Sequence, residues 1–246
     1  MDEEIKMLLE AISENDGATA RDLLARQPAL VHAADENGKT PLHMAGEKNN
    51  VELMELLLSL GADLQRETHW GMTPIQWAAS LGSRRAVELF LSRGGAALDL
   101  RSAAGIGDLE TVQRFWEAPG KLKPGAAQKK HQQLEDGTYV ALAPPTDYTE
   151  IVSDAFFTAA RNGHTRVASW LLEQGADVHV KGTLGATALH WAAGNGHRDT
   201  VRFLLDHGAD ADKELVDEEF GVTPAGWARH FGQTEIAEML ERGDGT

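Results

Sequence analysis

The strongest constraint on the fold is a sequence pattern that recurs along the chain. It reads GKTPLHMAGEKNN from Gly38, GMTPIQWAASLGS from Gly71, GATALHWAAGNGH from Gly185 and GVTPAGWARHFGQ from Gly221. The first two copies start 33 residues apart. A period of this size is typical of stacked repeats, in which each unit buries its apolar side only against its neighbours.

Each copy predicts two short helices joined by a tight turn. A threonine such as Thr40 stands where a helix N-cap belongs, because its hydroxyl can accept a hydrogen bond from a free backbone N–H. Pro41 follows at the first helical position, where a missing N–H costs nothing. The second helix is an apolar run such as ELLLSLGADL, and Gly61 near its end suits a left-handed helix terminus.

These motifs resemble the ankyrin repeat family, whose unit reads roughly G-x-T-P-L-H-x-A-A-x-x-G-H, then an apolar helix, then G-A-D. The resemblance covers nearly the whole chain except about residues 117–150. It implies an all-α solenoid of helix-turn-helix units with β-hairpin fingers between them. Aligning the units predicts seven helix pairs, which begin near Ile5, Thr40, Thr73, Leu98, Ser153, Thr187 and Thr223.

Two departures from the period divide the chain. The third and fourth units are too close together, and about eight residues are missing where the finger SRGGAALDLRS should be complete. The fourth and fifth units are too far apart because of an insertion. We therefore predict N-terminal units over residues 1–116, an insertion over 117–152 and C-terminal units over 153–246.

The insertion has two halves of different composition. Residues 118–132 are rich in Lys, Pro and Gly and lack apolar periodicity, which is typical of a mobile linker. The stretch LEDGTYVAL predicts a turn and a short strand. Residues 134–148 carry apolar surface that we expect to dock, with the missing finger as the nearest vacancy; these apolar side chains are Leu134, Tyr139, Val140 and Leu142. Two interpretations stay open, a passive surface loop and a flap over the groove.

The histidines recur with the repeat and do not cluster. His43 and His190 occupy the T-P-L-H position, which stiffens the turn in the family that the chain resembles, while His164 and His197 lie in the G-H turn. No zinc-binding spacing is present, and with no cysteine there is no disulfide, thiolate ligand or cysteine nucleophile. The sequence therefore predicts no catalytic residue, no metal site and no cofactor.

The composition limits the class of partner. The formal net charge of −15 repels phosphates, so nucleic acid and anionic membrane surfaces are disfavoured and a protein partner with a basic patch is favoured. No apolar run approaches the length of a membrane span, and the start, MDEEIKMLLEAI, is unlike a signal peptide. We expect a cytoplasmic location.

The finger tips are the candidate partner-binding residues. Ankyrin arrays generally bind proteins through these tips and through the groove face of the first helices, so the resemblance favours a non-enzymatic interaction scaffold. Three of the four residues that precede a finger glycine are apolar, and an exposed tryptophan such as Trp70 is typical of an interface hot spot. The predicted surface comprises Glu36, Asn37, Lys39, His69, Trp70, Met72, Leu184, Glu219 and Phe220.

An alternative is a small-molecule binder or enzyme with a pocket between the insertion and the groove. Acidic, imidazole and phenol side chains there could supply acid–base groups, although no catalytic signature fixes their geometry. The candidate pocket residues are His69, Trp70, Glu135, Tyr139, Asp147 and Tyr148.

Overall fold

The repeats fold into helix pairs, as predicted. The structure, a computed structural model, describes residues 3–94, 97–134, 137–182, 185–210, 217 and 221–242, with the backbone alone at 130–133 and 141. Within these residues the pairs are α1 (Glu3–Ser13) with α2 (Gly17–Arg26), α3 (Pro41–Glu47) with α4 (Val51–Ser59), α5 (Pro74–Ser80) with α6 (Arg84–Ser92), α7 (Leu100–Gly105) with α8 (Leu109–Gln113), α9 (Tyr148–Arg161) with α10 (Thr165–Glu173), α11 (Ala188–Gly194) with α12 (Arg198–Asp206), and α13 (Pro224–His230) with α14 (Thr234–Arg242). A short 3-10 helix, η1 (Pro28–His32), follows α2.

The T-P-L-H motif links each cap to the next finger. Thr40 caps α3 in a capping box with His43, and the Thr40 N–H donates to His43 Nδ1 over 3.2 Å. The proton of His43 is therefore on Nε2, which donates to the Met72 carbonyl over 3.0 Å. His190 repeats this arrangement with Thr187 and Val222. The structural role expected for these two histidines is confirmed.

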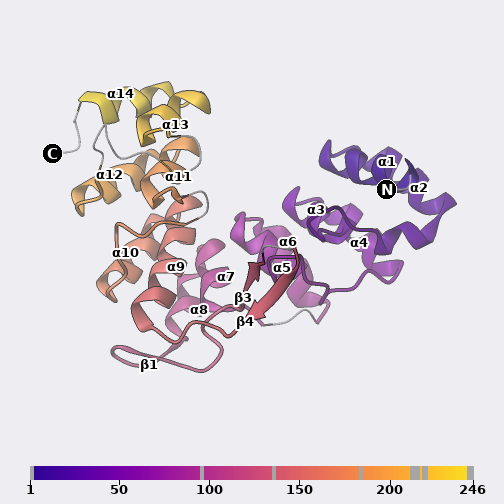
Figure 1. Ribbon diagram of the computed structural model, residues 1–246, viewed down its shortest axis with the longest axis horizontal. Coiled ribbons are helices and arrows are strands. Elements are labelled where there is room, and N and C mark those ends of the chain that lie inside the picture. The colour runs from indigo at the N-terminus through magenta and orange to yellow at the C-terminus, as the bar shows by residue number, and fades with distance from the viewer. Residues whose placement is uncertain are drawn as a thin grey trace. The chain divides into compact units, whose positions relative to one another are not determined.

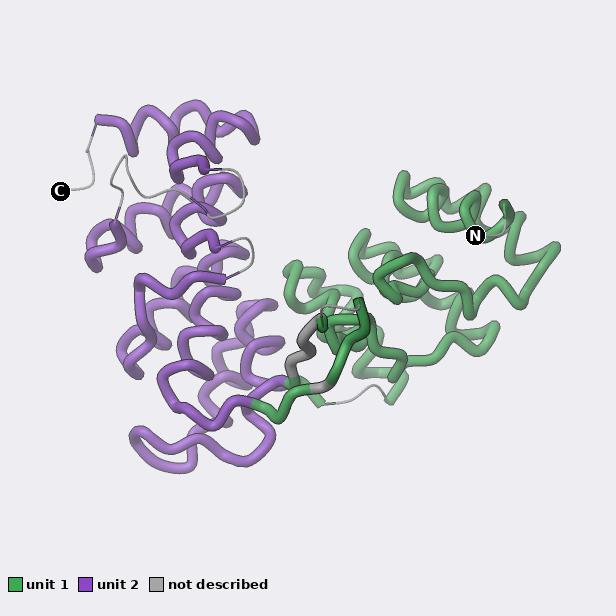
Figure 2. Tube along the Cα trace, in the orientation of Figure 1, with its two compact units in different colours: residues 1–98, 129–144 green, residues 99–128, 145–246 purple. Residues whose placement is uncertain are grey.

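The chain divides into two compact units, which Figure 2 shows in green and purple. Unit 1 comprises residues 1–98 and 129–144, and unit 2 comprises residues 99–128 and 145–246. The division falls at the shortened connection after α6 and splits the insertion, whereas the sequence suggested boundaries after residues 116 and 152. Each unit buries its own core, with Leu42 and Phe90 fully buried in unit 1 and Phe156 in unit 2.

Within each unit the helices form two layers. In unit 1 the first helices α1, α3 and α5 pack in sequence, and α2, α4 and α6 form the second layer. In unit 2 the first layer is α7, α9, α11 and α13, and the second is α8, α10, α12 and α14 (Figure 1). This arrangement places equivalent residues of successive first helices side by side.

The first half of the insertion belongs to unit 2. It contains strands β1 (Trp116–Ala118) and β2 (Lys121–Leu122), which pair in antiparallel fashion. Ala126 is buried, and its carbonyl accepts a hydrogen bond from the Leu100 N–H over 3.1 Å. Three other units have proline at this first helical position and so lack an N–H there, whereas the N–H of Leu100 needs an acceptor, which the insertion provides. This half therefore has more fixed contacts than its linker-like composition suggested, and its mobility stays a prediction.

The second half of the insertion forms a hairpin in unit 1. Strands β3 (Lys130–Gln133) and β4 (Tyr139–Leu142) pair in antiparallel register, with Gln133 opposite Tyr139. The sequence predicted β4 and did not predict β3. The end of the insertion is helical, because α9 begins at Tyr148 and not near Ser153, with Asp147 as its N-cap.

Candidate partner-binding site

Two successive fingers of unit 1 meet at their tips. The Asp35 carboxylate accepts hydrogen bonds from the N–H groups of Asn37 and Lys39, which fixes the first tip. The His69 N–H of the second finger donates to the Asn37 carbonyl over 2.9 Å. Gly38 lies between them with φ of 77°, and a Cβ there would stand 3.0 Å from the His69 ring. Both the backbone conformation and the close approach therefore require glycine.

An aromatic and charged cluster extends from these tips. The Trp70 ring stacks on the Trp77 ring, with centroids 5.7 Å apart and an interplanar angle of 12°. The Trp77 indole N–H donates to Glu47 Oε2 over 3.0 Å. Lys39 Nζ lies 5.2 Å from the Trp77 ring centroid and 3.7 Å from Glu47 Oε2. The stacking on Trp77 holds the Trp70 ring in place, while 39% of its surface remains exposed to solvent.

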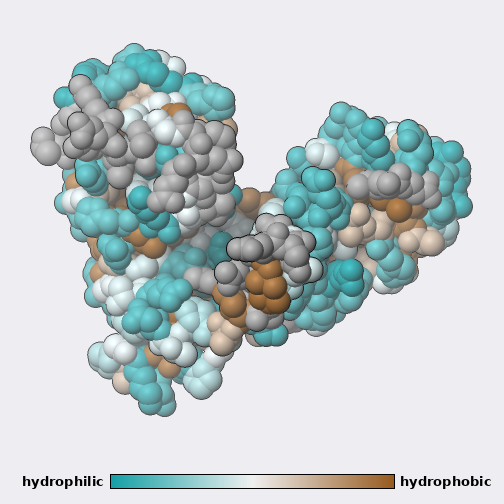
Figure 3. Space-filling model, viewed as in Figure 1, coloured by the Kyte–Doolittle hydropathy of each residue, from teal (hydrophilic) through white to brown (hydrophobic). Residues whose placement is uncertain are grey.

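The hairpin of the insertion reaches the same tips. The Tyr139 ring stacks on the His69 ring, with centroids 4.9 Å apart. Alternation along β4 directs Val140 and Leu142 away from the Tyr139 face, and both are exposed, as is Leu134. Figure 3 shows hydrophobic side chains gathered over β4. Of the four apolar side chains expected to dock, Tyr139 makes the aromatic contact, while the other three remain exposed.

We call the resulting set the finger-tip cluster. Its members come from α3, α5, the two fingers and the hairpin, and all of them belong to unit 1. They are Lys39, Glu47, His69, Trp70, Trp77 and Tyr139.

The structure gathers part of the predicted partner-binding surface. Asn37, Lys39, His69 and Trp70 lie together, and Glu36 is exposed beside them. The prediction that Met72 belongs to the exposed surface is wrong, because its side chain is only 8% exposed and its carbonyl accepts a hydrogen bond from His43. The remaining predicted residues, Leu184, Glu219 and Phe220, lie outside the described residues. The binding role of the set stays a prediction.

Glu47 and Trp77 were missed as surface residues. Tryptophan recurs at one position of the repeat, in Trp77, Trp191 and Trp227, which is typical of core packing, but the Trp77 side chain is only half-buried in the structure. The available signal was the repeat period, because Glu47 ends a first helix one unit before Trp77. Stacking successive first helices brings these two positions into contact.

The alternative pocket is not assembled within either unit. His69, Trp70 and Tyr139 belong to unit 1, whereas Asp147 and Tyr148 belong to unit 2. Asp147 caps α9 through the Glu150 N–H, and the Tyr148 hydroxyl accepts from Trp116 Nε1 and donates to the Gln174 carbonyl. Glu135 lies outside the described residues. The described residues of the proposed pocket in unit 2 therefore have structural roles.

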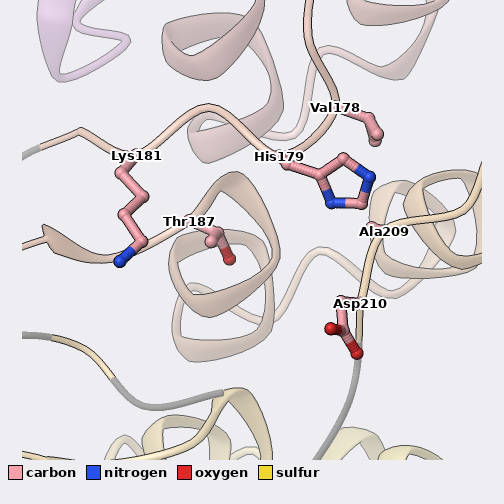
Figure 4. A pocket seen from close by; sticks show the side chains of 6 residues that line it. All are labelled: Val178, His179, Lys181, Thr187, Ala209 and Asp210. Atoms are coloured by element: carbon pink, nitrogen blue, oxygen red, sulfur yellow. The ribbon is translucent and has the colours of Figure 1, made fainter.

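A small concavity lies on the finger side of unit 2 (Figure 4). Its volume is about 130 Å³, below the 300–1,000 Å³ typical of sites for drug-sized ligands. It is lined by Val178, His179, Lys181, Thr187, Ala209 and Asp210. None of these residues was a predicted pocket residue, and the size suits at most a small group.

Two further features of the described residues concern metal binding and membrane insertion. No cluster of three or more potential metal-ligating His, Asp or Glu side chains occurs among them. None of the described helices combines the length and apolarity that a bilayer span requires.

The repeats are similar in sequence to those of known ankyrin repeat proteins. The family model for ankyrin repeats, in three copies, matches residues 8–102 and 156–244. The serine/threonine-protein kinase VIK of Arabidopsis thaliana is 38% identical over 82 residues, 33% of this chain and 19% of the kinase. The ankyrin repeat domain-containing protein SAT10 of Stachybotrys chartarum is 27% identical over 192 residues, 68% of this chain and 10% of that protein.

A shorter relative shows the same relationship. A putative ankyrin repeat protein of Rickettsia bellii is 41% identical over 64 residues, 26% of this chain and 38% of the relative. This chain thus spans well under two thirds of each relative, and the likeness concerns the repeats. The family model covers more than half of the chain, and the helix pairs, caps and fingers follow its repeat. The protein belongs to the ankyrin repeat family.

Proposed function

We propose that the protein is a non-enzymatic scaffold that binds a protein partner through the finger-tip cluster of unit 1. Ankyrin repeats are generally protein-interaction modules, which supports the class of function. The observation that carries the proposal is Trp70, which is 39% exposed and already stacked on Trp77. An aromatic side chain held in place before binding loses little conformational entropy when a partner covers it.

The surroundings of Trp70 favour a partner with apolar side chains and a polar rim. Lys39 and Glu47 flank the Trp77 ring and supply charges of both signs, while Glu36 adds an exposed carboxylate. The formal net charge of −15 favours the approach of a basic surface, so a basic patch on the partner stays part of the proposal. We also propose that the protein is located in the cytoplasm.

The test compares capture from a lysate of the source organism by three forms of the immobilised protein. These are the unaltered chain, Trp70→Ala and the matched control Leu91→Ala, which removes an equally exposed apolar side chain (41%) from α6. We expect at least one protein to be captured by the first and third forms and lost with Trp70→Ala, because a buried hot-spot tryptophan contributes about 2 kcal/mol or more. Identical capture by all three forms would overturn the finger-tip proposal.

A further inference from the structure

Three tryptophans occupy equivalent positions in the first helices, and two of them hydrogen-bond to a carboxylate. The Trp77 indole N–H donates to Glu47 Oε2 over 3.0 Å, and the Trp227 indole N–H donates to Asp217 Oδ2 over 2.9 Å. Trp191 Nε1 is buried and has no hydrogen-bond partner among the described residues. A buried donor without an acceptor is costly. At Trp191 the described residues supply no acceptor, so a ligand that brings one would be favoured.

The residue in the place of Glu47 explains the difference. Glu47 and Trp77 are 30 residues apart on successive first helices, and Arg161 and Trp191 have the same separation. The Arg161 guanidinium carbon lies 4.2 Å from the Trp191 ring centroid. The repeat thus brings an arginine to the indole where the corresponding unit brings a glutamate, and a cation cannot accept the indole proton.

Arg161 also lacks a counter-charge within the part of the chain that the structure describes. Apart from its contact with the Trp191 ring, its guanidinium has no ion pair or hydrogen bond among the described residues. The neighbouring Arg101 is different, because it lies 3.8 Å from Asp154 Oδ2 and donates to Thr158 Oγ1 over 3.2 Å. Burial, and then the charge of Arg101, lower the pKa of Arg161 to about 10. The site therefore has an excess of positive charge in a protein whose net charge is strongly negative.

We propose that Arg161 and Trp191 form a recognition site for one carboxylate, the side chain of an Asp or Glu in a peptide segment of a protein partner. The guanidinium fork matches a carboxylate in geometry and charge, and the indole N–H adds a donor. The ligand would take the role that Glu47 and Asp217 have at the other two tryptophans. The proposal concerns unit 2 alone and stands whether or not the finger-tip cluster binds a partner.

The charge balance favours a carboxylate over a phosphate. Among the described residues Arg161 lacks a counter-charge, whereas Arg101 already contacts Asp154, so one guanidinium is left for the ligand. The net charge of −15 also repels a dianion more strongly than a single carboxylate. The indole nitrogen is shielded from solvent in the free protein. The carboxylate therefore meets the guanidinium first, and the flexible Arg161 side chain must shift before the indole N–H is reached.

The test follows the tryptophan indole N–H signals by two-dimensional ¹H–¹⁵N NMR, with the Trp191 signal assigned through Trp191→Phe. The probe is the pentapeptide acetyl-Lys-Gly-Glu-Gly-Lys-amide, and its controls are the Gln counterpart and inorganic phosphate. We expect the Glu peptide to shift the Trp191 signal in a saturable way. The affinity for the Gln peptide should be lower by at least about 10-fold, which is the order expected for losing a charge-assisted hydrogen bond.

Two variants and a control separate recognition from folding. Arg161→Gln should lower the affinity for the Glu peptide about 10-fold. Arg202→Gln, which removes an exposed arginine from α12, should leave this affinity unchanged. Arg161→Glu should move the Trp191 signal without any peptide, because the new carboxylate can accept the indole N–H as Glu47 accepts that of Trp77, and it should abolish the response to the probe. Circular dichroism verifies that each variant is folded.

Three results would overturn the inference. These are equal shifts from the Glu and Gln peptides, a stronger response to phosphate than to the Glu peptide, and an unchanged response in folded Arg161→Gln. Because the probe is a defined peptide, these outcomes are independent of whether Trp70 captures a partner from a lysate.

Discussion

The Tyr139 ring stacks on the His69 ring with centroids 4.9 Å apart, and this contact joins the hairpin of the insertion to a finger tip of unit 1. Val140 and Leu142, on the other side of β4, remain exposed. The hairpin thus contacts the same tips that carry Trp70. A hairpin of two short strands has little stability of its own, so the aromatic contact should determine how firmly it is held.

Replacing Tyr139 with Ala should loosen the hairpin and leave the helices intact. An aromatic pair contributes about 0.5–1.5 kcal/mol beyond its buried area, so amide exchange at residues 137–142 should quicken several-fold. Hydrogen exchange read by mass spectrometry checks this, with Tyr139→Phe as the control that keeps the ring. Unchanged exchange in Tyr139→Ala would show that the hairpin is held by other contacts.

Replacing Tyr148 with Phe should destabilise unit 2, because this hydroxyl has a structural role. It accepts from Trp116 Nε1 over 3.0 Å and donates to the Gln174 carbonyl over 2.9 Å, and the Trp116 ring packs against Trp170. We expect a loss of about 1–2 kcal/mol in urea unfolding, since two partners are left without their hydrogen bonds. Tyr139→Phe is the matched control, because the Tyr139 hydroxyl makes no hydrogen bond among the described residues. Equal stability of both variants would contradict the assignment.

Acid should destabilise unit 1 through His43. Burial lowers the pKa of His43 from 6.5 to about 4, so the unfolded chain takes up the proton first as the pH falls. The stability that neutral His43 contributes is complete above pH 6.5 and is lost progressively as the pH falls toward 4. The loss at this residue is on the order of 3 kcal/mol.

The variant that isolates this effect is His43→Gln. Gln76 already fills the equivalent place in the third unit, where its side chain accepts from the Thr73 N–H. Urea unfolding between pH 7.5 and 4.5 should show a shallower decline for His43→Gln than for the unaltered protein. Parallel curves would mean that His43 does not control the acid response.

Replacing Thr187 with Ala should cost about 1 kcal/mol of stability, the usual effect of losing an N-cap. Thr187 forms a capping box with His190, and α11 has Ala188 where α3, α5 and α13 have proline. Denaturant unfolding measures the change, and Thr149→Ala, in the exposed first turn of α9, is the control. A midpoint equal to that of Thr149→Ala would count against the cap.

The sequence by itself determined the repeat fold. Thr40, Pro41 and His43 act within one turn of helix, and their hydrogen bonds and fixed backbone angles depend on near neighbours. Repetition of this local pattern indicated how many units there are, where the finger is missing and where the insertion stands. Such features are predictable because the interactions that cause them are short in sequence.

Only the tertiary structure decided which side chains meet across units and loops. No local pattern shows that Tyr139 lies on His69, that Tyr148 bonds Trp116, or that Arg161 covers Trp191. These contacts depend on the path of an insertion without a period and on the packing of successive helices. Their residues act through burial and distance, which the order of amino acids does not display until the chain is folded.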